Sequence, residues 1–167
     1  MEINENQKKV DKNLRLDLEV DLYGDSKRLD SRMKALRSST IQELNSISGS
    51  ILYNKITRGA DKAELSSDYF DNGLIQSGLV PKAKQTKWIG NTDTCLYDVN
   101  ETDVEKAMKD ARKRIVQYLT DCYEIADNLM KEETKNTFLL SNRASFTFVA
   151  MSGLLHTFAF NCGEIDK

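Results

Sequence analysis

Basic side chains gather at two places in the sequence, and such groups can hold the phosphates of a nucleic acid. The first group is Lys82, Lys84 and Lys87, with Trp88 directly after it. The second group lies on a segment with strong helical periodicity and consists of Lys106, Lys109, Arg112, Lys113 and Arg114. Lysine and arginine contact phosphate oxygens, and an indole ring can stack on a base. The spacing therefore suggests a phosphate-binding surface; the alternative is a solvated helix face, with Trp88 packed in the core.

Nucleophilic chemistry has one candidate pair, Cys95 and His156. His156 is the only histidine and lies among large apolar residues, which predicts a core or core-edge histidine with one hydrogen-bond partner. A cysteine–histidine dyad is the alternative, and it would need a further group to orient the imidazole. Cys122 falls on an apolar helical stripe and Cys162 follows an apolar helix, so both are expected to be inert packing groups.

Metal and nucleotide chemistry find no support in the sequence. One histidine and three scattered cysteines offer no local pair of soft ligands. Neither glycine-rich phosphate-binding motif, G-x-x-x-x-G-K-[ST] or G-x-G-x-x-G, occurs. We therefore predict no catalytic residue, no metal ligand and no cofactor.

The overall charge sets limits on the partners of the chain. Twenty-four basic and 26 acidic residues give a net charge of -2, so no global attraction draws the chain to nucleic acid or to an anionic membrane. The three cysteines form no C-x-x-C pair, and the N-terminus lacks the pattern of a secretory signal, which predicts a cytoplasmic location. Ala144–Gly163 is uncharged and long enough to cross a bilayer, but its several polar residues favour a buried helix and no membrane partner.

Apolar periodicity indicates the elements that would position these groups. It predicts helices at about 7–19, 26–47, 66–79, 103–131 and 142–160. Ser38, Ser39 and Thr40 should kink or break the second helix. Residues 51–57 are rich in β-forming types and predict a short strand or an extended segment. Thr102 and Glu105 form a capping box for the long helix.

These elements predict a mainly α fold: one helical domain over residues 1–167, with a long central helix, one short strand or hairpin, and a buried C-terminal helix. The last helix is apolar nearly all round, which is typical of a helix covered by several neighbours.

Three short strings carry a family resemblance. They are Ile3–Val10 followed by Leu14 and Leu18, Leu44–Asn45 followed by Ser50–Ile56, and Phe138–Arg143 entering an apolar helix. Together they resemble the DGQHR-domain proteins, a group that includes the DNA sulfur-modification regulator family DndB. The Asp-Gly-Gln-His-Arg signature itself is absent, so the resemblance implies the C-terminal part of a larger domain of that type.

The resemblance implies a bacterial or phage-related protein connected with DNA modification, restriction or defence, in a fold related to the ParB-like group. It carries over no catalytic residue. The matched polar positions are Lys8, Asn54, Lys55, Asn142 and Arg143. Helix capping and loop hydrogen bonding are the alternative roles for these side chains.

Besides an enzyme that uses Cys95 and His156, two hypotheses of function follow. The first is a non-catalytic, DNA-associated accessory or regulatory module that contacts phosphates through its basic groups. The second is a helical protein-interaction module that needs a missing N-terminal half or another partner. Its exposed apolar surface would come from Met33, Leu36 or the last helix. The oligomeric state stays open.

Overall fold

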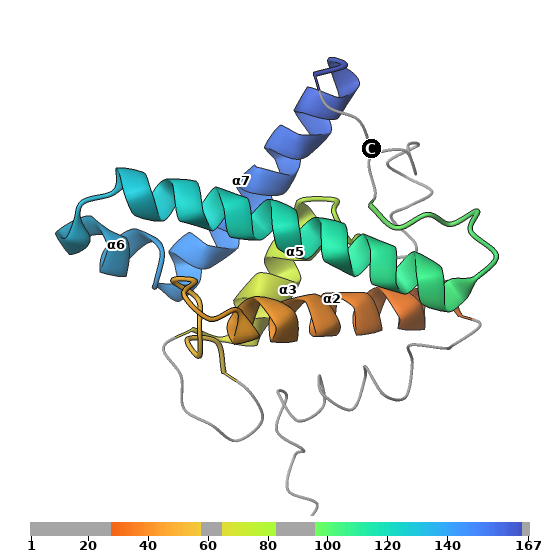
Figure 1. Ribbon diagram of the computed structural model, residues 1–167, viewed down its shortest axis with the longest axis horizontal. Helices are drawn as coiled ribbons and strands as arrows, with labels where there is room; N and C mark the ends of the chain where they lie inside the picture. The colour runs from red at the N-terminus through yellow and green to blue at the C-terminus, as the bar shows by residue number, and fades with distance from the viewer. Residues whose placement is uncertain (1–27, 58–64, 83–95, 165–167) are drawn as a thin grey trace, which may run out of the picture.

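The computed structural model describes residues 28–57, 65–82 and 96–164, and most of these residues are in helices. The helices are α2 (Leu29–Ser46), α3 (Ser67–Gln76), α5 (Val104–Leu129), α6 (Glu132–Phe138) and α7 (Asn142–Asn161) (Figure 1). The prediction of a mainly α fold is confirmed. The helix expected at 7–19 lies outside the described residues, and the short helix α6 was not predicted.

Helix α2 runs without a break through Ser38, Ser39 and Thr40, so the predicted kink is wrong. All three side chains are buried in the folded chain. The hydroxyl of Ser39 donates to the carbonyl of Leu36 at 3.1 Å, which satisfies it without opening the helix. Tertiary burial overrides the weak local preference of serine and threonine for helix ends.

The predicted strand at 51–57 is also wrong, because this segment folds as a series of turns. Tyr53 N–H donates to the Ser50 carbonyl at 3.0 Å, and Asn54 adopts a left-handed conformation with φ 55°. The side chain of Asn45, near the end of α2, accepts a hydrogen bond from Ile56 N–H at 2.8 Å. The β-structure described in this segment is an isolated parallel bridge between Ile56 and Leu65. The β-forming residues are thus used for burial rather than for strand pairing.

Helix α5 has nearly the predicted bounds, but its cap and its buried face differ from the prediction. Asp103, and not Thr102, is the N-cap, and its carboxylate accepts from Lys106 N–H at 3.0 Å. The buried side chains are Ala107, Ala111, Ile115, Val116, Leu119 and Tyr123. Ile125 and Leu129 belonged to the predicted stripe but are exposed, Leu129 at 80%. The helix extends past the core that it covers.

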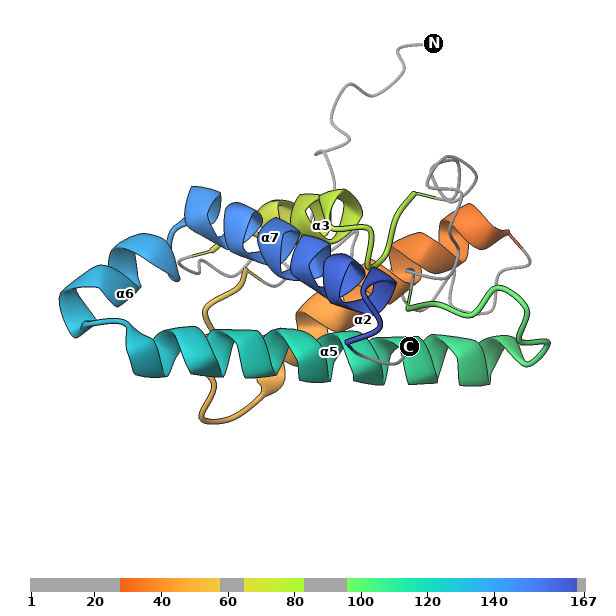
Figure 2. The same cartoon turned by 90° about the horizontal axis from the view of Figure 1, so that it is seen from above.

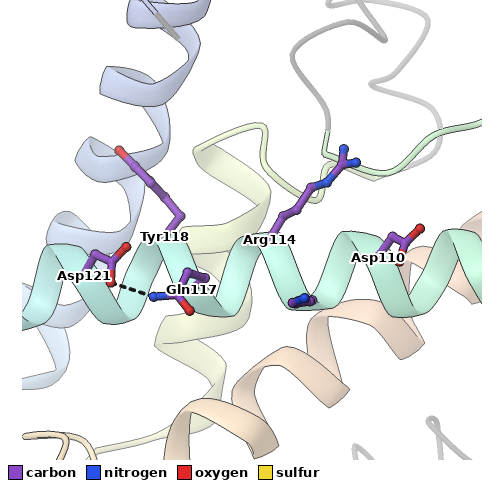
Figure 3. Close-up of a pocket in the computed structure, with 6 residues that line it drawn as sticks. Asp110, Arg114, Gln117, Tyr118 and Asp121 are labelled. Carbon is purple, nitrogen blue, oxygen red and sulfur yellow. Dashed lines mark hydrogen bonds between the residues drawn. The ribbon is translucent and has the colours of Figure 1, made fainter. Parts of the chain in front are cut away.

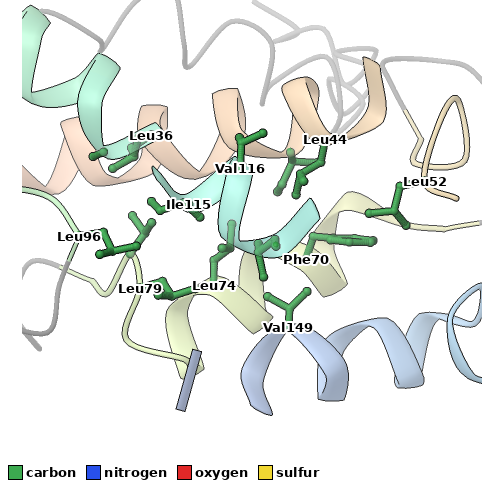
Figure 4. Packing of buried hydrophobic residues seen from close by; sticks show 14 of the residues in the cluster. Leu36, Leu44, Leu52, Phe70, Leu74, Leu79, Leu96, Ile115, Val116 and Val149 are labelled. Carbon is green, nitrogen blue, oxygen red and sulfur yellow. The ribbon is translucent and has the colours of Figure 1, made fainter. Parts of the chain in front are cut away.

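The core lies where four helices meet. Helix α5 packs on α2, and α7 packs mainly on α3 (Figure 2). Figure 4 shows Leu36 and Leu44 of α2, Phe70 and Leu74 of α3, Ile115 and Val116 of α5, and Val149 of α7 directed into the same apolar cluster. Arg37 of α2 is buried and ties this core to α3 through Asp71, with a Nε–Oδ1 distance of 2.6 Å. Met33 and Leu36 are buried in the cluster, so they offer no exposed apolar surface.

Two glycines bring α3 and α7 into close contact. A Cβ atom on Gly73 would lie 2.9 Å from Cβ of Val149, and one on Gly153 would lie 2.1 Å from Cβ of Ser77. Both contacts join equivalent turns of helices that run in the same direction. Neither position has room for a side chain, so this pair of sites sets the distance and the rotation of α7 on α3.

We expect Gly153→Ala to destabilise the protein by about 2 kcal/mol because the added methyl group meets Ser77. On helix propensity alone the same substitution would stabilise it by about 1 kcal/mol, so the sign of the change is informative. Chemical denaturation of the wild type and the variant measures it. A matched background, Ser77→Gly, removes the opposing Cβ and should reduce the cost of G153A; an equal cost in both backgrounds would contradict this packing.

Candidate interaction surface

Helix α7 has one buried face and one exposed apolar face. Ser145, Val149, Ser152, Gly153 and His156 are buried toward α3 and α5. The opposite face presents Met151, Leu154, Leu155 and Phe158, with exposed fractions of 53%, 53%, 61% and 67%. We call these four residues the apolar strip. The prediction that this helix is buried all round is wrong, because α3 and α5 cover it from one side only.

A hollow of about 380 Å³ adjoins the apolar strip at Met151. Its lining comes from the end of α5, from α6 and the residue after it, and from the start of α7: Met130, Phe138, Leu139, Arg143, Ala144, Thr147, Phe148 and Met151. The side chain of Phe138 at its edge is itself exposed. The strip and the hollow therefore form one apolar surface along the outer face of α7.

This surface is larger than a scatter of single exposed residues. The four strip side chains expose about 450 Å² together, and the largest apolar patch on an ordinary monomer is about 300 to 600 Å² and is often functional. Within the described part of the chain, no helix is both long enough and apolar enough to cross a membrane.

Tyr118 and His156 hold α7 against α5 beneath this surface. The Tyr118 hydroxyl donates to the Ser152 carbonyl at 2.6 Å, and the Tyr118 and His156 rings meet edge to face with centroids 4.8 Å apart. His156 is buried, with 8% of its surface exposed, as predicted for a core-edge histidine. The expected hydrogen bond is not seen at Nδ1, which is buried without a partner among the described residues. Burial lowers the pKa of His156.

Nothing in the described part of the chain joins His156 to a nucleophile. Cys95, its candidate partner, lies outside the described residues. Cys162 is exposed and Cys122 is partly exposed, so the expectation that both are buried is wrong. No group of three or more metal-binding side chains comes together among the residues that the structure describes.

The structure divides the basic residues of α5 into two sets. Lys106 pairs with Glu101 at 2.6 Å, and Arg112 pairs with Glu43 of α2 at 2.9 Å. The other set, Lys109, Lys113 and Arg114, is exposed and makes no ion pair with any described residue. Lys82 follows α3 at the edge of the described region, whereas Lys84, Lys87 and Trp88 lie outside it. Lys82 is therefore the only residue of the first predicted basic group that is described together with the α5 group.

The groove on the outer face of α5 carries both signs of charge. It has a volume of about 530 Å³ and is lined by Asp110, Lys113, Arg114, Gln117, Tyr118 and Asp121. Figure 3 shows Asp110 and Asp121 on either side of Arg114, with the amide of Gln117 donating to Asp121 at 2.8 Å. A phosphate at this groove would meet two carboxylates as well as two cations, which weakens its binding.

Two of the polar positions of the family resemblance, Asn54 and Asn142, take part in hydrogen bonds between described residues. The side-chain oxygen of Asn142 accepts from Ser66 N–H at 2.7 Å and fastens the start of α7 to the start of α3. Asn54 sits in a turn with its N–H bonded to the Asn45 carbonyl at 2.9 Å. Arg143 is exposed beside the hollow. Lys8 lies outside the described residues. Hydrogen bonding in loops and at helix ends accounts for Asn54 and Asn142.

Comparison of the chain with protein-family models, curated proteins and solved structures finds no match. The resemblance to DGQHR-domain proteins therefore stays a prediction from the three strings described above.

The buried His156 should make stability fall as the solution is acidified. Its pKa in the folded chain lies below the unfolded value of about 6.5, so between those two pH values the unfolded chain binds more protons. The contribution of neutral His156 to the free energy of unfolding is complete above pH 6.5. This contribution is lost as the pH falls toward the lowered pKa. Urea unfolding at pH 7.5 and at pH 5.5 measures the free energy of unfolding. Between these pH values it should fall less for His156→Gln than for the wild type. Equal losses would contradict the burial of a neutral imidazole.

Proposed function

We propose that the chain is a cytoplasmic helical protein-interaction module whose docking surface is the apolar strip together with the adjoining hollow. The observation that carries this proposal is the exposure of four large apolar side chains on one face of α7, while the opposite face of the same helix is packed in the core. The cysteine pattern supports the cytoplasmic location.

The physical basis is the removal of apolar surface from water. Burial contributes about 25 cal/mol for each Å² of apolar surface covered, before the costs of association are subtracted. The glycine contacts with α3 hold α7 in one orientation, so the surface is formed before any partner arrives. An apolar strip beside a hollow suits a helix that lays its own apolar side chains along it.

Photo-crosslinking in the host cell tests this proposal without knowledge of the partner. A photo-reactive phenylalanine analogue placed at Phe158 should give a discrete covalent adduct, because the partner covers that side chain. The matched control places the analogue at Tyr53, which is 44% exposed but lies on the turns after α2. The Leu154→Glu variant of the Phe158 probe should lose the adduct.

Absence of any adduct from position 158, or equal adducts from positions 158 and 53, would overturn the docking surface. An adduct of any single mass that depends on Leu154 supports it.

A DNA-associated accessory module is the second candidate, and it rests on the resemblance and on the charges of α5. The first half of this helix carries five basic residues against the two acidic residues Glu105 and Asp110. Lys109, Lys113 and Arg114 are exposed there and could contact phosphates.

If this surface binds DNA, Lys113→Glu/Arg114→Glu should lower the slope of log K against log salt by about 2, because each lost phosphate contact removes nearly one released counterion. The matched control, Lys34→Glu/Lys131→Glu, changes the net charge equally at exposed positions outside the groove. A filter-binding assay across a salt series measures both variants. No DNA binding by the wild type at low salt would remove this candidate function. An equal change of the salt slope in the two variants would also remove it.

A further inference from the structure

The apolar strip fits a copy of itself. Resting on the proposed docking surface, we propose that its occupant is the strip of a second copy of this chain, with the two α7 helices antiparallel about a twofold axis between Leu154 and Leu155. Four observations carry this choice: the register of the strip, the absence of charge along it, the charges at its two ends, and the area that it exposes.

The register of the strip is symmetric. In an antiparallel pair, residues equally distant from the midpoint face each other across the axis. A midpoint between Leu154 and Leu155 places Leu154 opposite Leu155 of the second copy and Met151 opposite Phe158. Each of the four exposed side chains then faces a strip residue of the second copy, and none is left without one. The outer pairs bring a thioether against an aromatic ring, which is a favourable contact.

The absence of charge along α7 suits a twofold contact. At such an interface the same patch is used by both copies, so a charge near the axis would face a like charge. Ala144–Gly163 contains no formal charge over its whole length. A partner of different sequence would not require this face to lack charged residues.

The charges that flank this stretch favour the antiparallel direction. Arg143 precedes it and Glu164 follows it, and both side chains are exposed. Antiparallel pairing brings Arg143 of each copy near Glu164 of the other, at both ends of the contact. Parallel pairing would place each charge beside its own like charge, and would also align the two helix dipoles unfavourably.

The exposed area is close to what a specific dimer requires. Complete coverage of both strips would remove about 900 Å² from water, which is close to the lower limit of about 1,000 Å² for a biological interface. The C-terminal end of α7 projects past α5 (Figure 1), and the four strip residues are exposed, so a second helix has access to them.

Disulfide trapping in the full-length chain tests the register. Thr147 and Cys162 are both exposed and lie equally far from the midpoint on opposite sides, so Thr147→Cys should bond to Cys162 of the second copy. Within one copy these residues are about 22 Å apart along the helix, too far for a disulfide. In a Cys95→Ser/Cys122→Ser background, mild oxidation of T147C should give a covalent dimer with both bonds formed.

Three matched controls accompany the trap. Cys162 alone, T147C with Cys162→Ser, and Asn128→Cys on the exposed face of α5 with Cys162 kept should each stay monomeric under the same oxidation. Dimerisation of Cys162 alone to the same extent would overturn the antiparallel register. Unchanged helical circular dichroism of each variant shows that the chain is folded.

Sedimentation equilibrium tests the second copy itself. The wild type should dimerise, and Leu155→Glu, which puts two carboxylates beside the axis, should raise the dimer Kd by about 100-fold or more. A wild type that stays monomeric up to millimolar concentration overturns this inference. If the crosslinking probe at position 158 then captures a different protein, the docking surface stands and only the identity of its occupant changes; if that probe captures nothing, both fail.

Discussion

The arrangement of this molecule depends on the close contact between α3 and α7 at two glycines. Because Gly73 and Gly153 have no side chains, the two helices approach until Val149 and Ser77 fill the space between them. That contact fixes the rotation of α7 about its own axis. The face with Ser152 and His156 is then held against α5, and the face with Leu154 and Leu155 must point away from the core. The apolar strip is a direct result of this rotation.

Four of the five described helices were predicted from the sequence, α5 from a strong apolar period, but the sequence could not predict which face of each helix is covered. Helix α7 has apolar residues nearly all round, so its sequence pattern does not indicate which face is buried. Its exposed side depends on neighbours that are distant in the chain. Helix α5 has a clear stripe, yet Leu129 is exposed because the helix is longer than the core beneath it. The error at Ser38–Thr40 arose in the same way, since the burial of these side chains is a tertiary effect.

For the candidate sites, too, the sequence identified residues but not their partners in the folded chain. The basic residues of α5 were identified, but the partnership of Arg112 with Glu43 joins two helices and cannot be read from local spacing. Likewise the carboxylates that share the α5 groove with Lys113 and Arg114 reduce its value for phosphate, although their positions were visible in the sequence. The exposed strip was among the predicted sources of apolar surface, whereas Met33 and Leu36 proved to be core residues.

The contact of α3 with α7 also has a kinetic consequence. Gly73 and Val149 are about 75 positions apart, and all of α5 lies in the loop that their contact closes. Closing a loop of this length costs about 4 kcal/mol of chain entropy before the contact returns any energy. Helix pairs that are near in sequence meet sooner than such distant ones. The contact of α5 with α2 closes a loop of similar length, since Glu43 and Arg112 are also far apart in the chain. The strip takes its orientation only once the contact of α7 with α3 has formed.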